Sequence, residues 1–191
     1  MAWSKAGTTT LGSAGDILSI SGLTAQKFNV FLSHQISSGN TNKKRTCNNS
    51  TGSLYAVRYS ADGGADGTSV SQSALNSNLY SAADEFVIDY VCSISGEEKL
   101  AIMYNCSQRA VGAGTAPSRY EWAWKYVPSP DADITQFDYD NDDSGSYDTN
   151  SNLTALGSDG VESISIQDGA VYYDTDTNKS YVLYSGSWSE L

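Results

Sequence analysis

The sequence is short of cations, and that shortage disfavours two classes of partner. Lysine and arginine together number 11 against 22 aspartate and glutamate residues, which gives a formal net charge of −11 at pH 7. Phosphate backbones and anionic lipid surfaces repel such a chain, so we expect no nucleic-acid partner and no binding to a membrane surface. No hydrophobic run approaches the ~20 residues of a spanning helix, so we also expect no membrane insertion.

Cysteine and histidine are scarce as well. Cys47, Cys92 and Cys106 show no Cys-x-x-Cys spacing, so a zinc site is not indicated. We expect all three to be small buried apolar residues, and their odd number favours synthesis in a reducing cytoplasm. His34 is the single histidine, and it falls in an apolar row of a strand. It is therefore interpreted as packing in the core or in an interface.

Motifs of the common enzyme classes are missing. The chain has no glycine-rich phosphate loop and no Gly-x-Ser-x-Gly elbow. Glycoside hydrolysis needs two carboxylates that face each other across a cleft. Glu97 and Glu98 fall at a hairpin tip, and Glu121 stands alone beside aromatic residues, so these acids do not form such a pair. We predict that the protein is not an enzyme.

What the sequence does contain is alternation of apolar and polar residues with a period of two, which indicates β-strands. Strands are predicted at 28–36, 54–59, 86–94, 100–106, 119–127, 170–174 and 180–184, with a weak strand at 134–139 and a short helical turn within 71–80. Many short strands separated by turn residues predict an all-β fold. The expected architecture is an antiparallel β-sandwich, jelly-roll-like, with a C-terminal β-hairpin.

The apolar rows of two consecutive strands are expected to face the core. They are Phe86, Ile88, Tyr90, Cys92 and Ile94 on the first strand, and Leu100, Ile102, Tyr104 and Cys106 on the second.

Two domains are predicted. Residues 1–160 form the sandwich, and residues 161–191 form a hairpin packed on it. Within the first domain, residues 1–15 are poor in core residues apart from Trp3 and Leu11. We expect this N-terminal arm to reach onto an adjacent subunit, because exposed strand edges have to be covered or blunted.

Three acids have a spacing that suits a metal ion. Asp138, Asp140 and Asp142 follow a D-x-D-x-D pattern, and oxygen ligands at alternate positions suit a hard cation such as Ca²⁺. Asp143 stands where the EF-hand loop requires glycine, and Thr149 stands where it requires glutamate. The segment is thus either a calcium site without the EF-hand pattern or a solvated acidic loop.

An aromatic row is the strongest single feature of the chain. Tyr120, Trp122, Trp124 and Tyr126 share one face of a predicted strand. Such a row can fill the core, form a subunit interface or stack on sugar rings as a ligand platform. All three alternatives stay open from the sequence.

The last residues carry a resemblance. The run Tyr172-Tyr173-Asp174-Thr175, followed by Asn178-Lys179, Tyr184, Gly186 and Trp188, resembles a terminal hairpin common in tailed-phage fibre and other virion proteins. The phrases at 59–68 and 96–100 resemble environmental viral structural proteins with a jelly-roll-like sandwich. The resemblance implies a virion surface component, such as a head decoration, capsid or tail-fibre protein, commonly trimeric or otherwise repeated.

The expected function is therefore that of a virion structural protein that acts through self-assembly. Its partners would be copies of itself, as a trimer or lattice, and other virion proteins. The start of the sequence lacks the pattern of a signal peptide, so we expect synthesis in the host cytoplasm and incorporation into the virion. The alternative is a receptor- or carbohydrate-binding β-sandwich module that recognises host-surface glycans.

Overall fold

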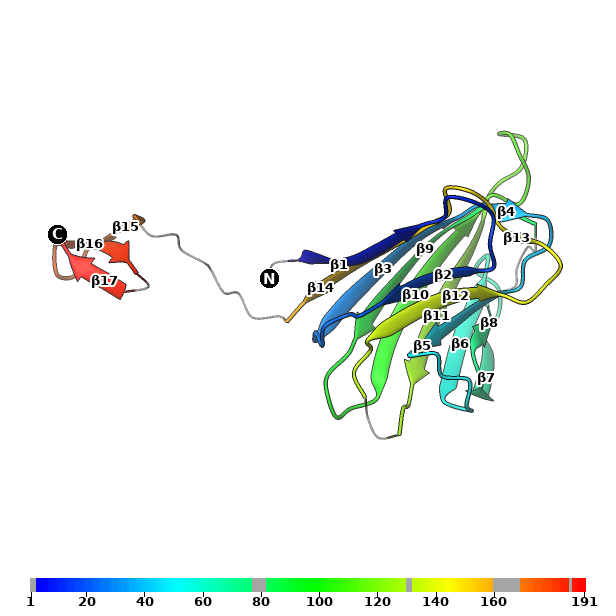
Figure 1. Cartoon of the computed structure of the whole chain (residues 1–191), viewed down its shortest axis with the longest axis horizontal. Coiled ribbons are helices and arrows are strands. Elements are labelled where there is room, and N and C mark those ends of the chain that lie inside the picture. The colour runs from blue at the N-terminus through cyan, green and yellow to red at the C-terminus, as the bar shows by residue number, and fades with distance from the viewer. Residues whose placement is uncertain (1–2, 77–81, 130–131, 160–168, 186) are drawn as a thin grey trace. The chain divides into compact units, whose positions relative to one another are not determined.

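The computed structural model describes residues 3–76, 82–129, 132–159, 169–185 and 187–191 (Figure 1). The chain divides into two compact units, Met1–Gly160 and Val161–Leu191. The described residues form strands and no helix, so none of them builds a helix able to cross a membrane. The all-β prediction is confirmed. Of the helical turn predicted within 71–80, residues 71–76 instead end one strand and form another, and 77–80 lie outside the described residues.

Unit 1 is an antiparallel β-sandwich of unequal sheets, and its finer assignment as a jelly roll stays a prediction. The large sheet has eight strands in the order β1 (Ser4–Thr10), β14 (Asn152–Ser158), β3 (Phe28–Gln35), β9 (Glu85–Cys92), β10 (Lys99–Ser107), β11 (Ser118–Tyr126), β6 (Tyr55–Ala61) and β7 (Gly67–Gln72). The small sheet has four, β2 (Ile17–Ser21), β12 (Gln136–Asn141), β5 (Lys43–Cys47) and β8 (Leu75–Asn76). A two-stranded pair joins β13 (Ser146–Tyr147) to β4 (Ser37–Ser38).

The small sheet covers one face of the large sheet, and the core lies between them (Figure 1). Phe31 of β3 stacks on Phe137 of β12, with ring centroids 3.9 Å apart and planes 7° from parallel. Around this stack lie buried apolar side chains of both sheets, including Leu18, Ile20, Val87, Met103, Trp122, Leu153 and Ala155. Offset aromatic stacking and apolar burial together hold the two sheets face to face.

The rows expected to face the core on β9 and β10 point the other way, so that prediction is wrong. The buried set on β9 is Glu85, Val87, Asp89 and Val91, whereas Phe86 and Tyr90 are about half exposed. On β10, Ala101, Met103 and Asn105 are buried, whereas Leu100, Ile102 and Tyr104 are about half exposed. Alternation predicts which residues share a face. It does not predict which face points inward, because the interior contains acids whose partners lie on distant strands.

The cysteine prediction is confirmed for one residue of the three. All three are free thiols, and Cys47 is buried in the core. Cys92 is partly exposed and Cys106 is exposed, because both lie on the outward-pointing rows.

The N-terminal segment is not an arm in this structure, and the expectation that it leaves the subunit is wrong for 4–10. These residues form β1, the edge strand of the large sheet, which pairs with β14 of the same chain from Ser4 opposite Gly157 to Thr10 opposite Asn152. The register shifts between Lys5 and Gly7. An irregularity of this kind twists an edge strand and makes it a poorer template for further pairing.

Unit 2 contains the predicted hairpin and one strand more. β15 (Val171–Asp174) pairs with β16 (Lys179–Tyr184), and β16 pairs with β17 (Ser187–Glu190). Asp174 closes the turn by accepting hydrogen bonds from the Thr177 hydroxyl at 2.7 Å and the Asp176 backbone N–H at 3.0 Å. Leu183 is the one buried apolar residue among the described residues of this unit. The described strands of unit 2 therefore enclose almost no core.

The inside and outside assignment of the large sheet predicts a contrast between two phenylalanines. Phe31→Ala should lower the free energy of unfolding by about 3–5 kcal/mol, because it leaves a cavity beneath Phe137. Phe86→Ala, at a half-exposed position, should cost less than about 1 kcal/mol. Chemical denaturation of both variants at low protein concentration measures the difference. Equal losses would contradict the assignment.

Candidate functional site

The outward-pointing residues of the central strands of the large sheet form a continuous surface, here called the outer face. Backbone pairing of β3, β9, β10, β11 and β6 aligns them in four cross-strand rows. In strand order the rows are Phe28, Cys92, Leu100, Lys125 and Ala56; Val30, Tyr90, Ile102, Ala123 and Arg58; Leu32, Ile88, Tyr104, Glu121 and Ser60; and His34, Phe86, Cys106 and Arg119. The β3, β9 and β10 side of this surface is apolar, and the β11 and β6 side is polar.

The apolar side of the outer face is exposed. Phe86, Tyr90, Leu100, Ile102 and Tyr104 are 47–55% exposed, although they lie next to one another across β9 and β10. Apolar surface in contact with water costs about 25 cal/mol per Å². Contiguous exposed apolar patches on a folded protein are typical of interaction sites for proteins, membranes or ligands.

A groove of about 780 Å³ crosses one end of the outer face. Its lining is almost wholly apolar and includes Phe28, Tyr90 and Ile102. It also includes Trp3, next to edge strand β1, and Val70 of the opposite edge strand β7. Because residues from both edges line one groove, the outer face is hollowed in this direction rather than flat.

The charged groups around the outer face neutralise one another. Arg58 contacts Asp66 at 3.2 Å, Lys125 contacts Glu98 at 3.0 Å, and Arg119 contacts Glu121 at 3.7 Å. All six side chains are largely exposed, so these pairs contribute little to stability. Their consequence is electrostatic, because the face has little net charge although the chain as a whole has −11.

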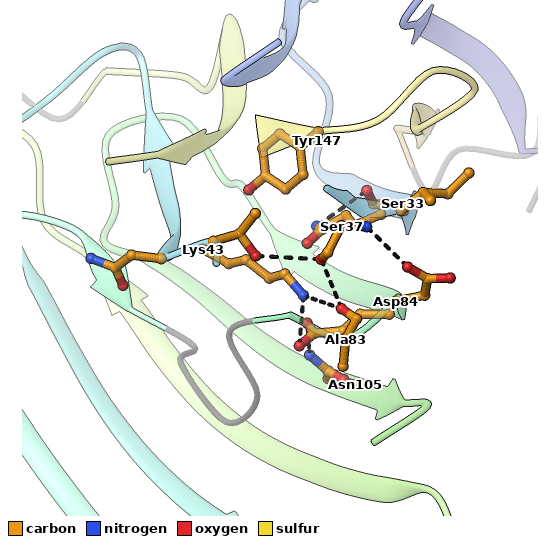
Figure 2. Close-up of polar contacts among 12 residues, drawn as sticks. Ser33, Ser37, Lys43, Ala83, Asp84, Asn105 and Tyr147 are labelled. Atoms are coloured by element: carbon orange, nitrogen blue, oxygen red, sulfur yellow. Dashed lines mark hydrogen bonds and ion pairs between the residues drawn. The ribbon is translucent and has the colours of Figure 1, made fainter. Parts of the chain in front are cut away.

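A polar cluster lies on the opposite face of the same sheet, between the two sheets of the sandwich (Figure 2). Lys43 forms an ion pair with Glu85 at 2.9 Å and donates to the backbone carbonyl of Ala83 at 2.7 Å. Asn105 donates to the other carboxylate oxygen of Glu85 at 2.6 Å. Burial lowers the pKa of Lys43, and the charge of Glu85 opposes that effect. The cluster joins β5 of the small sheet to β9 and β10 of the large one.

Neighbouring contacts fix the chain segment that leads into β9. The backbone N–H of Ser37 donates to Asp84 at 2.9 Å, and its hydroxyl donates to Ala83 O at 2.9 Å (Figure 2). Lys43 and Glu85 are at most 1% exposed. The cluster is suited to hold the two sheets in register.

A second buried set of contacts converges on Asp89 of β9. Its carboxylate accepts hydrogen bonds from Trp124 Nε1 at 2.8 Å and from the Tyr139 hydroxyl at 2.7 Å. Arg45 Nε lies 3.6 Å from the same carboxylate, and its guanidinium lies 5.1 Å from the Trp122 ring centre and 5.3 Å from that of Tyr139. Burial, and next the charge of Asp89, raise the pKa of Tyr139 well above its usual range. Asp89 thus connects three strands of the two sheets, β11, β12 and β5.

These contacts show where the predicted aromatic row lies. Trp122, Trp124 and Tyr126 are buried in the core, and Tyr120 packs against it partly buried. Tyr126 stacks on Tyr55 of β6, with ring centroids 5.0 Å apart. The sequence left three alternatives open for this row, and the structure places it in the core.

The predicted calcium ligands lie on β12 and just beyond it, and they do not act as one set. Asp138 accepts hydrogen bonds from Ser19 and Gln136, the latter at 2.9 Å. Asp140 lies nearby and shares the Thr46 hydroxyl with it, at 3.4 Å from Asp140 and 3.5 Å from Asp138. Asp142 is instead paired with Lys44. Among the residues that the structure describes, no group of three His, Cys, Asp or Glu side chains is placed to hold a metal ion.

The outer face was missed by the sequence reasoning, although a signal for it exists. β9 carries apolar residues on both of its faces, Val87 and Val91 inward and Phe86 and Tyr90 outward. A strand that is apolar on both faces is typical of a sheet that is covered on both sides.

No family model, curated protein or solved structure matches this chain. Function must therefore be inferred from the surfaces described above.

The Lys43–Glu85 pair predicts strong coupling in a double-mutant cycle. Lys43→Met should lower the free energy of unfolding by about 3–5 kcal/mol, because it leaves the buried Glu85 carboxylate without its cation. Adding Glu85→Gln removes that charge and keeps an acceptor for Asn105, so most of the loss should be recovered. Urea denaturation of the two single variants and the double variant gives the coupling. Additive losses would show that the pair is not coupled.

The Asp140 carboxyl predicts a pH-dependent gain in stability on substitution. Burial, and next the charge of Asp138, raise the pKa of Asp140 above 3.8 in the folded state. The folded state then holds this proton more tightly than the unfolded state. Stability therefore falls as pH rises from 3.8 to the raised pKa of the folded state, and it stays lower at higher pH. Asp140→Asn should raise the melting temperature at pH 7, and the gain should shrink below pH 3.8.

Asp142→Asn is the matched control for this experiment. Asp142 lies two residues further on and is largely exposed, with Lys44 as its partner. Its substitution should change the melting temperature little at either pH. A gain from Asp140→Asn that is independent of pH would contradict the assignment.

Proposed function

We propose that this chain is a non-enzymatic structural protein of a virion that acts by assembling with other copies and with neighbouring virion proteins. The observation that supports it most is the outer face, where half-exposed apolar residues of β9 and β10 stand side by side. The resemblance of the terminal hairpin and of the 59–68 segment to virion proteins supports the setting. Copies in an assembly would cover the apolar surface that a lone subunit leaves in water.

The most unusual ionisable groups of the chain support a role without catalysis. Glu85, Asp89, Lys43 and Arg45 are buried and engaged with one another or with aromatic side chains. Such groups are found in active sites when a cleft leads to them. Here they lie between the sheets, where they bind the two layers together.

The proposed site of synthesis is the host cytoplasm, with the finished protein on the outside of the particle. Three free thiols, two of them at least partly exposed, fit a chain that folds under reducing conditions.

A second candidate function is glycan binding by unit 2, because this unit displays aromatic rings on its surface. Tyr172 stacks on Tyr181 with ring centroids 6.0 Å apart and packs edge-on against Trp188 at 5.9 Å. These residues line a groove of about 660 Å³. Exposed rings of this kind can stack on sugars. A glycan array probed with the wild type and Trp188→Ala would separate this candidate from an assembly protein without glycan affinity.

The proposed function predicts a discrete assembly in solution. Light scattering of the purified full chain should detect an assembly whose mass is a defined multiple of the subunit mass. The assembled fraction should grow with protein concentration. The measurement is made with calcium and with a chelator, because dependence on calcium would give Asp138 and Asp140 a role as ligands. A subunit that stays monomeric at all concentrations would contradict self-assembly.

A further inference from the structure

We propose that the outer face is the surface on which two copies of this chain pair, sheet against sheet, about a twofold axis that lies in the interface plane near Ile102. This inference rests on the proposed self-assembly and adds to it the surface, the partner and the symmetry.

The exposed apolar area is of the size that a stable dimer buries. Seven large apolar side chains on or bordering the outer face are 45–68% exposed: Trp3, Val70, Phe86, Tyr90, Leu100, Ile102 and Tyr104. With ~200 Å² for a large side chain, they expose about 700 Å² together. The largest patch on a typical monomer is about 300–600 Å², and a standard interface buries about 800 Å² per partner. The face therefore exceeds what a monomer normally exposes and matches one half of a dimer interface.

The charge distribution favours a second copy over a partner of opposite charge. A chain with a net charge of −11 repels its own copies over most of its surface. The outer face avoids that repulsion because each of its cations, Arg58, Lys125 and Arg119, has an anion beside it. A strongly cationic or anionic partner would find no net charge here to attract it. Two copies can meet on this face without an electrostatic penalty.

The general shape of a twisted sheet, which is a saddle, is compatible with a second copy. Strands in a sheet are rotated from one to the next, so the surface is hollow along one diagonal and raised along the other. A twofold axis that runs along or across the strands maps this saddle onto itself. The raised diagonal of one copy then lies over the hollow diagonal of its partner, as in other face-to-face sheet packings.

The symmetry makes the centre of the patch its most sensitive point. Ile102 lies in the middle of its strand and of its cross-strand row, between Tyr90 and Ala123. A residue near the twofold axis meets its own copy, so one substitution acts twice. Ile102→Glu would place two like charges against each other in an apolar interface. We expect it to weaken dimerisation by at least about 100-fold.

Ile17→Glu is the matched control. Ile17 is the same residue type and slightly more exposed, 56% against 52% for Ile102, but it lies on β2 of the small sheet. The full chain and both variants are compared by light scattering across a range of concentrations, with circular dichroism to verify folding. The wild type and Ile17→Glu should dimerise, and Ile102→Glu should stay monomeric.

The natural thiols give a second readout that needs no substitution. Cys106 lies on the outer face and is exposed in the lone subunit, whereas Cys47 is buried in the core. Labelling with a maleimide, read by mass spectrometry, should slow at Cys106 as the dimer forms and stay negligible at Cys47. In Ile102→Glu, the labelling rate at Cys106 should not depend on concentration.

The outcomes separate this inference from the proposed function. A dimer that survives Ile102→Glu with Cys106 still open to the maleimide would leave self-assembly standing and overturn the outer face as its surface. A wild type that is monomeric at every concentration would overturn both. Native mass spectrometry that finds a monomer with a small apolar molecule bound would also overturn the inference, because the groove would then be a ligand site.

Discussion

The contacts of Asp89 set the arrangement of the rest of the sandwich. Its carboxylate lies in the core and accepts hydrogen bonds from Trp124 of β11 and Tyr139 of β12, with Arg45 of β5 close by. An ionised group in an apolar interior is costly unless its partners are in place, so β9 can take only the register that provides them. Side chains alternate along a strand, so this one position decides which residues of β9 point outward. The apolar outer face is the consequence.

The same polar interior explains why so much apolar surface is left outside. Lys43, Glu85, Asn105 and Asp89 occupy positions between the sheets that aliphatic residues usually fill. Buried ion pairs add little to stability compared with apolar residues of the same size, but a register that breaks them is heavily penalised. The sandwich thus obtains a well-defined pairing of its two sheets, while Tyr90, Leu100 and Ile102 stay on the far side of β9 and β10, half in contact with solvent.

The strands were largely predictable from the sequence, and the direction in which they face was not. Alternation located β3, β6, β9, β10, β11, β12 and the terminal hairpin to within a few residues. β1, β2 and β14 were missed. Threonine, serine and glycine dominate β1, as in Gly7-Thr8-Thr9-Thr10, and β2 has only five residues. The side that faces the core depends on partners such as Tyr139 for Asp89, which lie 50 residues apart, and no local pattern records that pairing. The aromatic row on β11 could therefore be recognised in the sequence, but its location could not. Its hydrogen bonds and stacking in the structure show that it fills the core.

The place of β1 at the edge of the large sheet has a consequence for how the chain folds during synthesis. Thr8 of β1 bonds to Thr154 of β14 across 146 residues of sequence. A ribosome adds about 5–20 residues per second, so β1 waits on the order of 7–30 s before its partner strand exists. Until then its backbone groups are unpaired, and the β14 side of β3 is also open. Closure of unit 1 is thus a late and cooperative event with a high contact order, and crowded nascent chains have that interval in which to exchange edge strands.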